Sequence, residues 1–103
     1  MATYFAQACV LCGTLAEYCF ADYRKRKWFQ CPQCTEYQVT DMAERKLDRA
    51  PKEWLQGLAA KARGTPPNTV LVISVPTGPH PEGYAYAALQ GESVPRDQLP
   101  QCL

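Results

Sequence analysis

Four cysteines are the residues whose type and spacing most clearly indicate a chemistry in this chain. They form two pairs, Cys9-Val-Leu-Cys12 and Cys31-Pro-Gln-Cys34, separated by 18 residues. Two cysteines with two residues between them in a tight turn direct both sulfurs toward one point, and two such turns facing each other form the tetrahedral thiolate cage that zinc prefers. The spacing therefore predicts one Zn²⁺ per chain, bound by Cys9, Cys12, Cys31 and Cys34.

Four thiolate ligands would leave no open coordination position, so we expect the metal to be structural and not catalytic. Gly13 can supply the left-handed backbone that the first turn needs, and Pro32 stiffens the second turn. Two other interpretations of the cysteines remain open, namely disulfide bonds and redox exchange. A redox enzyme usually has a single such pair at the junction of a strand and a helix, which favours the metal.

Two further cysteines lie outside this pattern. Cys19 stands between Tyr18 and Phe20 and is expected to be a small buried apolar residue. Cys102 lies one residue before the end of the sequence, and we expect no specific role for it. Either could replace one of the four predicted ligands if the proposed pairing is wrong.

The residues around the two pairs resemble zinc-ribbon domains. The resemblance depends on Cys9-Val-Leu-Cys12-Gly13 and on Trp28-Phe29-Gln30-Cys31-Pro32-Gln33-Cys34, in which an aromatic strand leads into the second turn. It covers residues 1–38, and Thr35 stands where many ribbons have glycine. Because zinc ribbons serve transcription factors, ribosomal proteins, nucleases and adaptors, the resemblance implies a fold and a metal but little about function.

The remaining elements follow from hydrophobic patterning, and together they predict a small α+β domain. Within the ribbon we expect strands near 4–6, 15–20 and 24–30, with a turn near Ala21-Asp22. Residues 41–63 are predicted to be helical, capped by Thr40 or Asp41 and ended by Gly64, with Pro51 causing a kink or two abutting helices. Residues 69–75 form the strongest predicted strand, with 84–89 as its hairpin partner and an irregular tail over 91–103.

The predicted packing places the ribbon and the 69–90 hairpin on the helical segment. Ala43, Leu47, Ala50, Trp54 and Leu58 recur at helical spacing and draw one apolar stripe. We expect Trp54, Leu47 and Leu58 to carry the contact. The sequence leaves open whether the two β elements share one sheet.

Composition limits the function classes. The chain has 103 residues, 47% of them hydrophobic, and a formal net charge of +1, which does not suggest a strongly basic nucleic-acid binder. The first basic residue is Arg24, and Glu17 and three thiols interrupt the apolar stretch before it, so neither a secretory signal nor a membrane span is expected. We predict a cytoplasmic protein without a membrane role.

One basic and aromatic run is a candidate contact with a partner: Arg24, Lys25, Arg26, Lys27 and Trp28. On a ribbon strand these cations could grip phosphates while Trp28 or Tyr23 stacks on a base. The same cations would also stabilise a zinc–tetrathiolate site, whose net charge is about −2. Exposed cations on a strand also protect it from edge-to-edge aggregation.

We find no pattern typical of an enzyme. His80, the only histidine, lies in a loop without a catalytic or ligand partner at a telling spacing. The sequence therefore favours a non-enzymatic zinc protein that binds a macromolecular partner, most readily a protein surface, as an adaptor, regulator or inhibitor. Small proteins of this kind encoded by phages and mobile elements include inhibitors of host machines. Tyr84 and Tyr86 are further candidate contacts. The alternative is a nucleic-acid-binding ribbon that uses the run from Arg24 to Trp28. The oligomeric state is left open.

Overall fold

The chain folds as a mixed α+β protein, as expected. A computed structural model describes residues 3–75 and 89–102. Within them lie six strands: β1 (Phe5–Ala8), β2 (Leu15–Ala21), β3 (Arg26–Cys31), β4 (Thr35–Thr40), β5 (Thr69–Ser74) and β6 (Gln90–Pro95). The helices are α1 (Asp41–Leu47), α2 (Lys52–Arg63) and the short 3-10 helix η1 (Arg96–Gln98).

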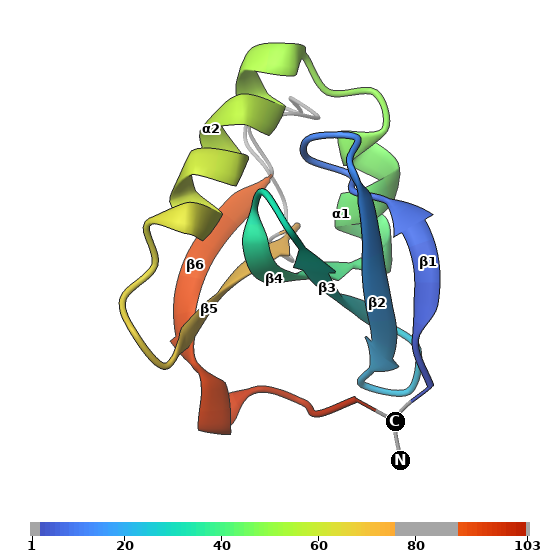
Figure 1. Ribbon diagram of the computed structural model, residues 1–103, viewed down its shortest axis with the longest axis vertical. Coiled ribbons are helices and arrows are strands. Elements are labelled where there is room, and N and C mark those ends of the chain that lie inside the picture. The colour runs from blue at the N-terminus through green and yellow to red at the C-terminus, as the bar shows by residue number, and fades with distance from the viewer. Residues whose placement is uncertain (1–2, 76–88, 103) are drawn as a thin grey trace.

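All six strands belong to one sheet, and their order across it is their order along the chain (Figure 1). Neighbouring strands are antiparallel except β4 and β5, which are parallel. Parallel neighbours need a long crossover, and α1 and α2 provide it. The N-terminal strands and β5–β6 therefore share one sheet, which settles the question that the sequence left open.

β4 joins the two parts of this sheet, and it was not among the strands predicted from the sequence. Its side chains alternate between the two faces, with Tyr37 and Val39 toward the helices and Gln38 away from them. All three are almost completely buried. A strand covered on both faces, with a glutamine on one of them, lacks the clear alternation of apolar and polar residues that would have marked it.

The predicted helical segment 41–63 divides into two abutting helices at Pro51, which is one of the two expected outcomes. Thr40 caps α1, because its side chain accepts a hydrogen bond from the Ala43 amide at 3.2 Å. The cap is therefore Thr40, and the alternative cap Asp41 is the first residue of α1. Gly64 ends α2, as predicted.

One core lies between the sheet and the helices, and it includes Leu47 of α1, Ala59 and Ala62 of α2, and Leu71 and Ile73 of β5. The prediction that Trp54 carries this contact is wrong, since its side chain is 39% exposed. The break between the helices changes the phase of the helical pattern, so that α2 buries Ala59 and Ala62 and partly buries Leu55 and Leu58.

The prediction of an irregular tail from residue 91 is wrong, because β6 occupies 90–95. Its register with β5 places Val94 opposite Val70. Glycine, glutamate, serine and proline are poor strand formers, so pairing with the apolar β5 overrides the local preference. The predicted partner strand 84–89 was not the partner found, and its residues 84–88 lie outside the described part of the chain.

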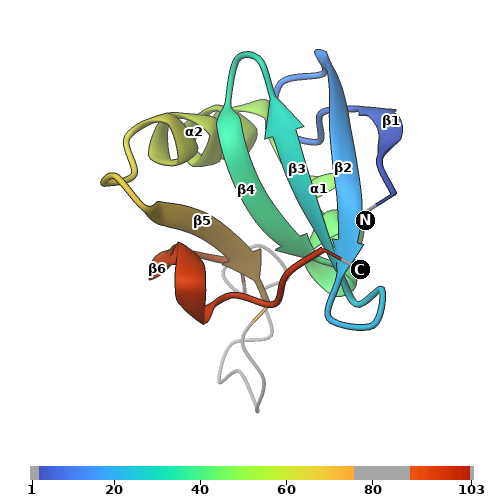
Figure 2. The ribbon, with the colours of Figure 1, turned by 60° about the horizontal axis from the view of Figure 1, so that its bottom comes forward.

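A second, smaller core lies on the other face of the sheet, under residues 96–102, which we call the C-terminal strap. It contains Cys19, Trp28, Val70, Val72 and Leu99. Gln38 donates to the carbonyl of Pro100 at 3.1 Å. In the view of Figure 2 the helices lie behind β3 and β4, whereas the strap passes in front and returns toward β2. The strap thus covers the part of this face that holds Trp28, Gln38 and Val70.

A disulfide fixes the end of the strap. Cys19 and Cys102 are bonded, with their Cα atoms 5.6 Å apart, and Ala21 of β2 forms an isolated β-bridge with Cys102. Cys19 is buried, as expected. The expectation that Cys102 has no specific role is wrong, because Cys102 is bonded to Cys19 of β2. The two cysteines are 83 positions apart in the sequence, so no local pattern indicated that they would pair.

Candidate metal centre

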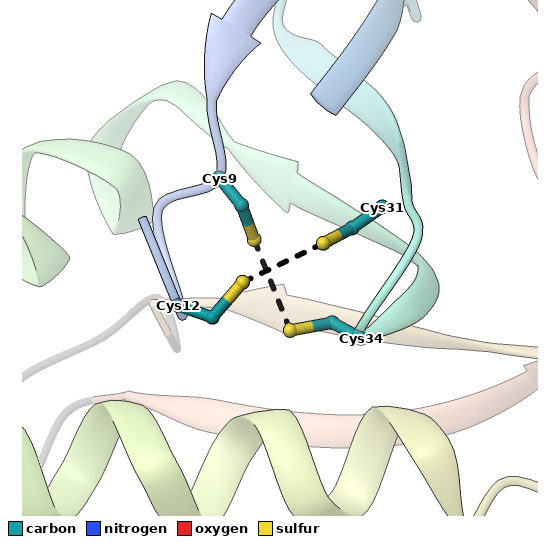
Figure 3. Close-up of side chains that lie close together, drawn as sticks. All are labelled: Cys9, Cys12, Cys31 and Cys34. Carbon is teal, nitrogen blue, oxygen red and sulfur yellow. Dashed lines mark hydrogen bonds between the residues drawn. The ribbon is translucent and has the colours of Figure 1, made fainter. Parts of the chain in front are cut away.

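The four predicted ligands converge on one point (Figure 3). Cys9 follows β1, Cys31 ends β3, and Cys12 and Cys34 lie in the two turns. The Sγ atoms of Cys9 and Cys34 are 3.9 Å apart, those of Cys12 and Cys31 are 3.5 Å apart, and all four lie within 4.8 Å of one another. A tetrahedron with metal–sulfur distances of about 2.3 Å has sulfur–sulfur edges of about 3.8 Å, so the cluster could hold a metal ion.

The first cysteine turn has the backbone geometry that the sequence predicted. Gly13 adopts a left-handed φ of 81°, and its amide donates to the Cys9 carbonyl at 2.8 Å. The amide of Leu11 lies 3.4 Å from the Cys9 Sγ atom. An amide directed at a sulfur favours the thiolate form, which is the form that binds metals.

The second turn repeats this geometry without a glycine. The Gln33 amide lies 3.4 Å from the Cys31 Sγ atom, and Thr35 takes the left-handed conformation with a φ of 70°. A β-branched residue is disfavoured there. A hydrogen bond from the Thr35 hydroxyl to the Ala62 carbonyl at 3.1 Å holds the residue in place, so α2 stabilises the turn.

Three of the four sulfurs are removed from solvent. Cys9, Cys31 and Cys34 are buried, whereas Cys12 is exposed. Burial raises the pKa of Cys34 and of Cys9, since a lone thiolate is poorly solvated there. Burial also opposes ionisation of Cys12, but hydrogen bonds from Thr14, Cys31 and Cys34 outweigh it and lower its pKa to about 6. A cation at the centre would stabilise all four as thiolates.

Tyr37 also belongs to the site, although it was not predicted from the sequence. Its hydroxyl lies 3.1 Å from the Cys9 Sγ atom, and the residue is fully buried. Burial, followed by the interaction with Cys9, raises the pKa of this phenol, so it stays protonated and can donate to the sulfur. The only signal in the sequence was its position three residues after Cys34, on what proves to be a strand.

The basic and aromatic run is divided by the structure. Strand β3 begins only at Arg26, and Tyr23 and Arg24 lie in the preceding turn with left-handed φ angles of 54° and 70°. Trp28 is only 6% exposed and packs in the second core, so its ring is covered in this fold. The strand predicted near 24–30 therefore begins two residues later than expected, and Arg24 and Lys25 lie outside it.

The four cations of the run also differ in their surroundings. Lys27 lies 3.0 Å from the Glu44 carboxylate, 2.9 Å from the Gln7 side-chain oxygen and 4.7 Å from the centre of the Tyr18 ring. Arg26 is 3.3 Å from the side chain of Gln38 and 3.9 Å from Asp22. Arg24 lies over the Phe20 ring at 5.7 Å, and Lys25 is exposed.

No protein-family model matches the chain, and neither a curated protein nor a solved structure shows significant similarity to it. The cysteine cluster within β1–β4 is consistent with a zinc-ribbon-like segment, and it identifies no particular family. Among the described residues, no helix has the length and apolar character needed to cross a membrane.

Proposed function

We propose that this chain is a non-enzymatic zinc protein that binds the surface of another protein through its N-terminal strands. Zinc is supported by the donor set, since four thiolates at tetrahedral spacing suit Zn²⁺ better than oxygen-seeking cations. Its role is structural, because four protein ligands leave no position for substrate or water. The two turns each contribute two ligands, so the ion ties β1, β3 and β4 together.

The observation that carries the protein-binding proposal is an exposed group of aromatic rings beside β1. Phe5 lies 5.4 Å from Tyr18 and 5.6 Å from Phe20, measured between ring centroids, and Tyr18 lies 5.5 Å from Phe20. We call these three residues the aromatic edge. Phe5 is 42% exposed, and the other two rings are half-buried. Tyr23, at 85% exposure, lies in the turn that follows β2. Aromatic residues with partly free surface are enriched in protein interfaces.

The surroundings of these rings favour protein over nucleic acid. Stacking of a base requires a free ring face beside free cations. Lys27 lies over Tyr18 and is paired with Glu44, while Arg24 lies over Phe20, so charged groups already occupy ring faces. If the chain instead binds nucleic acid, Arg24 and Lys25 are the exposed cations of the run that could contact phosphates. In the protein-binding reading the chain would act as an adaptor, regulator or inhibitor.

The metal half of the proposal is tested by native mass spectrometry of the intact protein with and without a chelator. We expect one zinc per chain, with loss of the fold on chelation, since binding to four thiolates contributes about 10–16 kcal/mol. The same spectra report whether Cys19 and Cys102 form a disulfide. That bond bears on the predicted cytoplasmic location, because disulfides are rare in that compartment. A metal-free chain that remains folded would overturn the structural role of zinc.

The partner half is tested by affinity capture from nuclease-treated and untreated extracts, comparing matched variants. Phe5→Asp and Tyr23→Asp each place a charge on the proposed surface. Met42→Asp places the same charge on α1, where Met42 is 61% exposed, and serves as the control. We expect a protein that binds wild type and Met42→Asp with or without nuclease, and loses binding to the other two variants. Capture that depends on nucleic acid, or that all three variants retain, would contradict the proposal.

A further inference from the structure

We propose that the free edge of β1 binds an extended segment of the partner protein as an added, seventh strand of the sheet. This inference rests on the proposed protein-binding function and specifies how the partner is held. Within the described residues β1 is an outer strand, paired with β2 alone. An outer strand presents backbone donors and acceptors in a row, and an extended peptide is the ligand that matches such a row.

The register shows which backbone groups face outward. Ala8 lies opposite Leu15, so the next pair is Cys9 and Thr14, and the Cys9 amide donates to the Thr14 carbonyl at 2.8 Å. Antiparallel pairs alternate between those that exchange hydrogen bonds and those that do not. Gln7 and Phe5 therefore bond to β2, whereas the amides and carbonyls of Ala6 and Ala8 point away from the sheet.

The two edges of the sheet are protected differently. β6 carries Gly91, Glu92 and Pro95, and Lys61 of α2 donates to the Gly91 carbonyl at 3.3 Å. Proline, charge and covering side chains are the usual means by which outer strands avoid pairing. Among the described residues β1 shows none of these three: its sequence is Phe-Ala-Gln-Ala, its register with β2 runs without a bulge, and no side chain bonds to the outward backbone groups of Ala6 and Ala8. An outer strand left without protection is consistent with use as a binding edge.

The side chains beside this edge indicate the chemistry of the added strand. Phe5 offers an exposed apolar surface, which suits an apolar side chain of the partner. Arg24 lies over the Phe20 ring of the same aromatic edge and has no carboxylate within ion-pair distance among the described residues. An acidic side chain at the corresponding end of the partner segment would supply that charge. We therefore expect an extended segment that combines apolar and acidic residues.

A second copy of this chain fits the edge less well. Pairing of β1 with β1 would bring together two strands of four residues each. Neither strand carries an acidic residue that could pair with Arg24 beside this edge. A linear segment of another protein needs only the backbone row and the few adjoining side chains.

The experiment uses a pair of substitutions at Ala6 in the full, zinc-loaded chain. Ala6→Pro removes an outward-facing amide without touching the bonds to β2, and proline is tolerated on outer strands. Ala6→Thr changes the side chain and keeps the amide, so it is the matched control. The probe is a phage-displayed library of random linear peptides, followed by anisotropy titration of the enriched peptides as synthetic, labelled chains.

We expect enriched peptides that contain apolar and acidic residues, that bind Ala6→Pro at least about tenfold more weakly than wild type, and that bind Ala6→Thr nearly as well as wild type. Failure to enrich any peptide, or equal binding to all three proteins, would overturn the proposal. A wild-type dimer that Ala6→Pro dissociates would assign the edge to a second copy instead.

Hydrogen exchange provides a second measurement that does not depend on the proline variant folding. A bound strand should slow exchange of the Ala6 and Ala8 amides, while the Gln7 amide, already bonded to β2, should change little. Protection that does not alternate in this way would contradict strand addition. The two proposals also separate: if the captured protein is lost on Phe5→Asp but retained by Ala6→Pro, the binding function stands and the added strand does not.

Discussion

Replacing Cys102 with serine should destabilise the protein by an amount that follows from the length of the loop that its disulfide closes. The bond joins residues separated by 83 positions. Closing a loop of that size lowers the entropy of the unfolded chain by about 15 cal/mol/K, or about 4.5 kcal/mol at 25 °C. Measured values for disulfides are mostly about 2–4 kcal/mol, so we expect a loss of at least about 2 kcal/mol, with the loop-closure value as its upper limit. Such a loss is a large share of the 5–15 kcal/mol that is typical of a domain.

The assay is urea unfolding of the zinc-loaded protein, followed by far-UV circular dichroism. Gln101→Ser is the control, because Gln101 lies in the same strap and, among the described residues, its side chain donates to the carbonyls of Arg96 and Leu99 alone. It should cost about 1 kcal/mol or less. Equal unfolding midpoints for Cys102→Ser and for a wild type whose intact mass confirms the disulfide would refute the loop-closure reasoning. A loss for Gln101→Ser as large as for Cys102→Ser would assign the effect to packing of the strap.

Two further predictions address the metal site and the core. Tyr37→Phe removes the hydroxyl beside the Cys9 sulfur. It should weaken metal affinity by about 10–100-fold without loss of the fold, as measured by competition with a chromophoric chelator. Unchanged affinity would contradict the role of this hydroxyl. Leu47→Ala should cost about 2–5 kcal/mol in urea unfolding, whereas Trp54→Ala, at a residue outside the buried core, should cost clearly less. A larger loss of stability for Trp54→Ala than for Leu47→Ala would support the apolar stripe predicted from the sequence. It would contradict the structure, in which α2 buries Ala59 and Ala62 and leaves Trp54 partly exposed.

The arrangement of the cysteine cluster was the most predictable part of the site, because its information is local. Two residues between the members of each pair, a glycine after the first pair and a proline within the second specify both turns before any tertiary contact forms. Tyr37 could not be assigned in the same way. Its contact with Cys9 requires β4 to lie beside β3, and that pairing is a property of the whole sheet.

The partner-binding residues, in contrast to the cysteines, could not be predicted from local sequence. Charge and aromaticity drew attention to Arg24 through Trp28, but those properties do not tell a surface residue from a buried one. Trp28 is covered by the strap, and Lys27 is neutralised by Glu44 from a helix 17 residues away. The aromatic edge was not predicted, because Phe5, Tyr18 and Phe20 come together only when β1 pairs with β2.

The sequence by itself determined the four-cysteine cluster, the helical segment with its break at Pro51, and the apolar strand β5, since each depends on residues close together in the chain. Only the tertiary structure decided that one sheet joins both halves, that residues 90–95 form its last strand, and that Cys102 returns to Cys19. The physical reason is that strand pairing and loop closure depend on which distant surfaces exclude water together. Strand pairing and loop closure therefore depend on residues throughout the chain, and a short stretch of sequence contains little information about them.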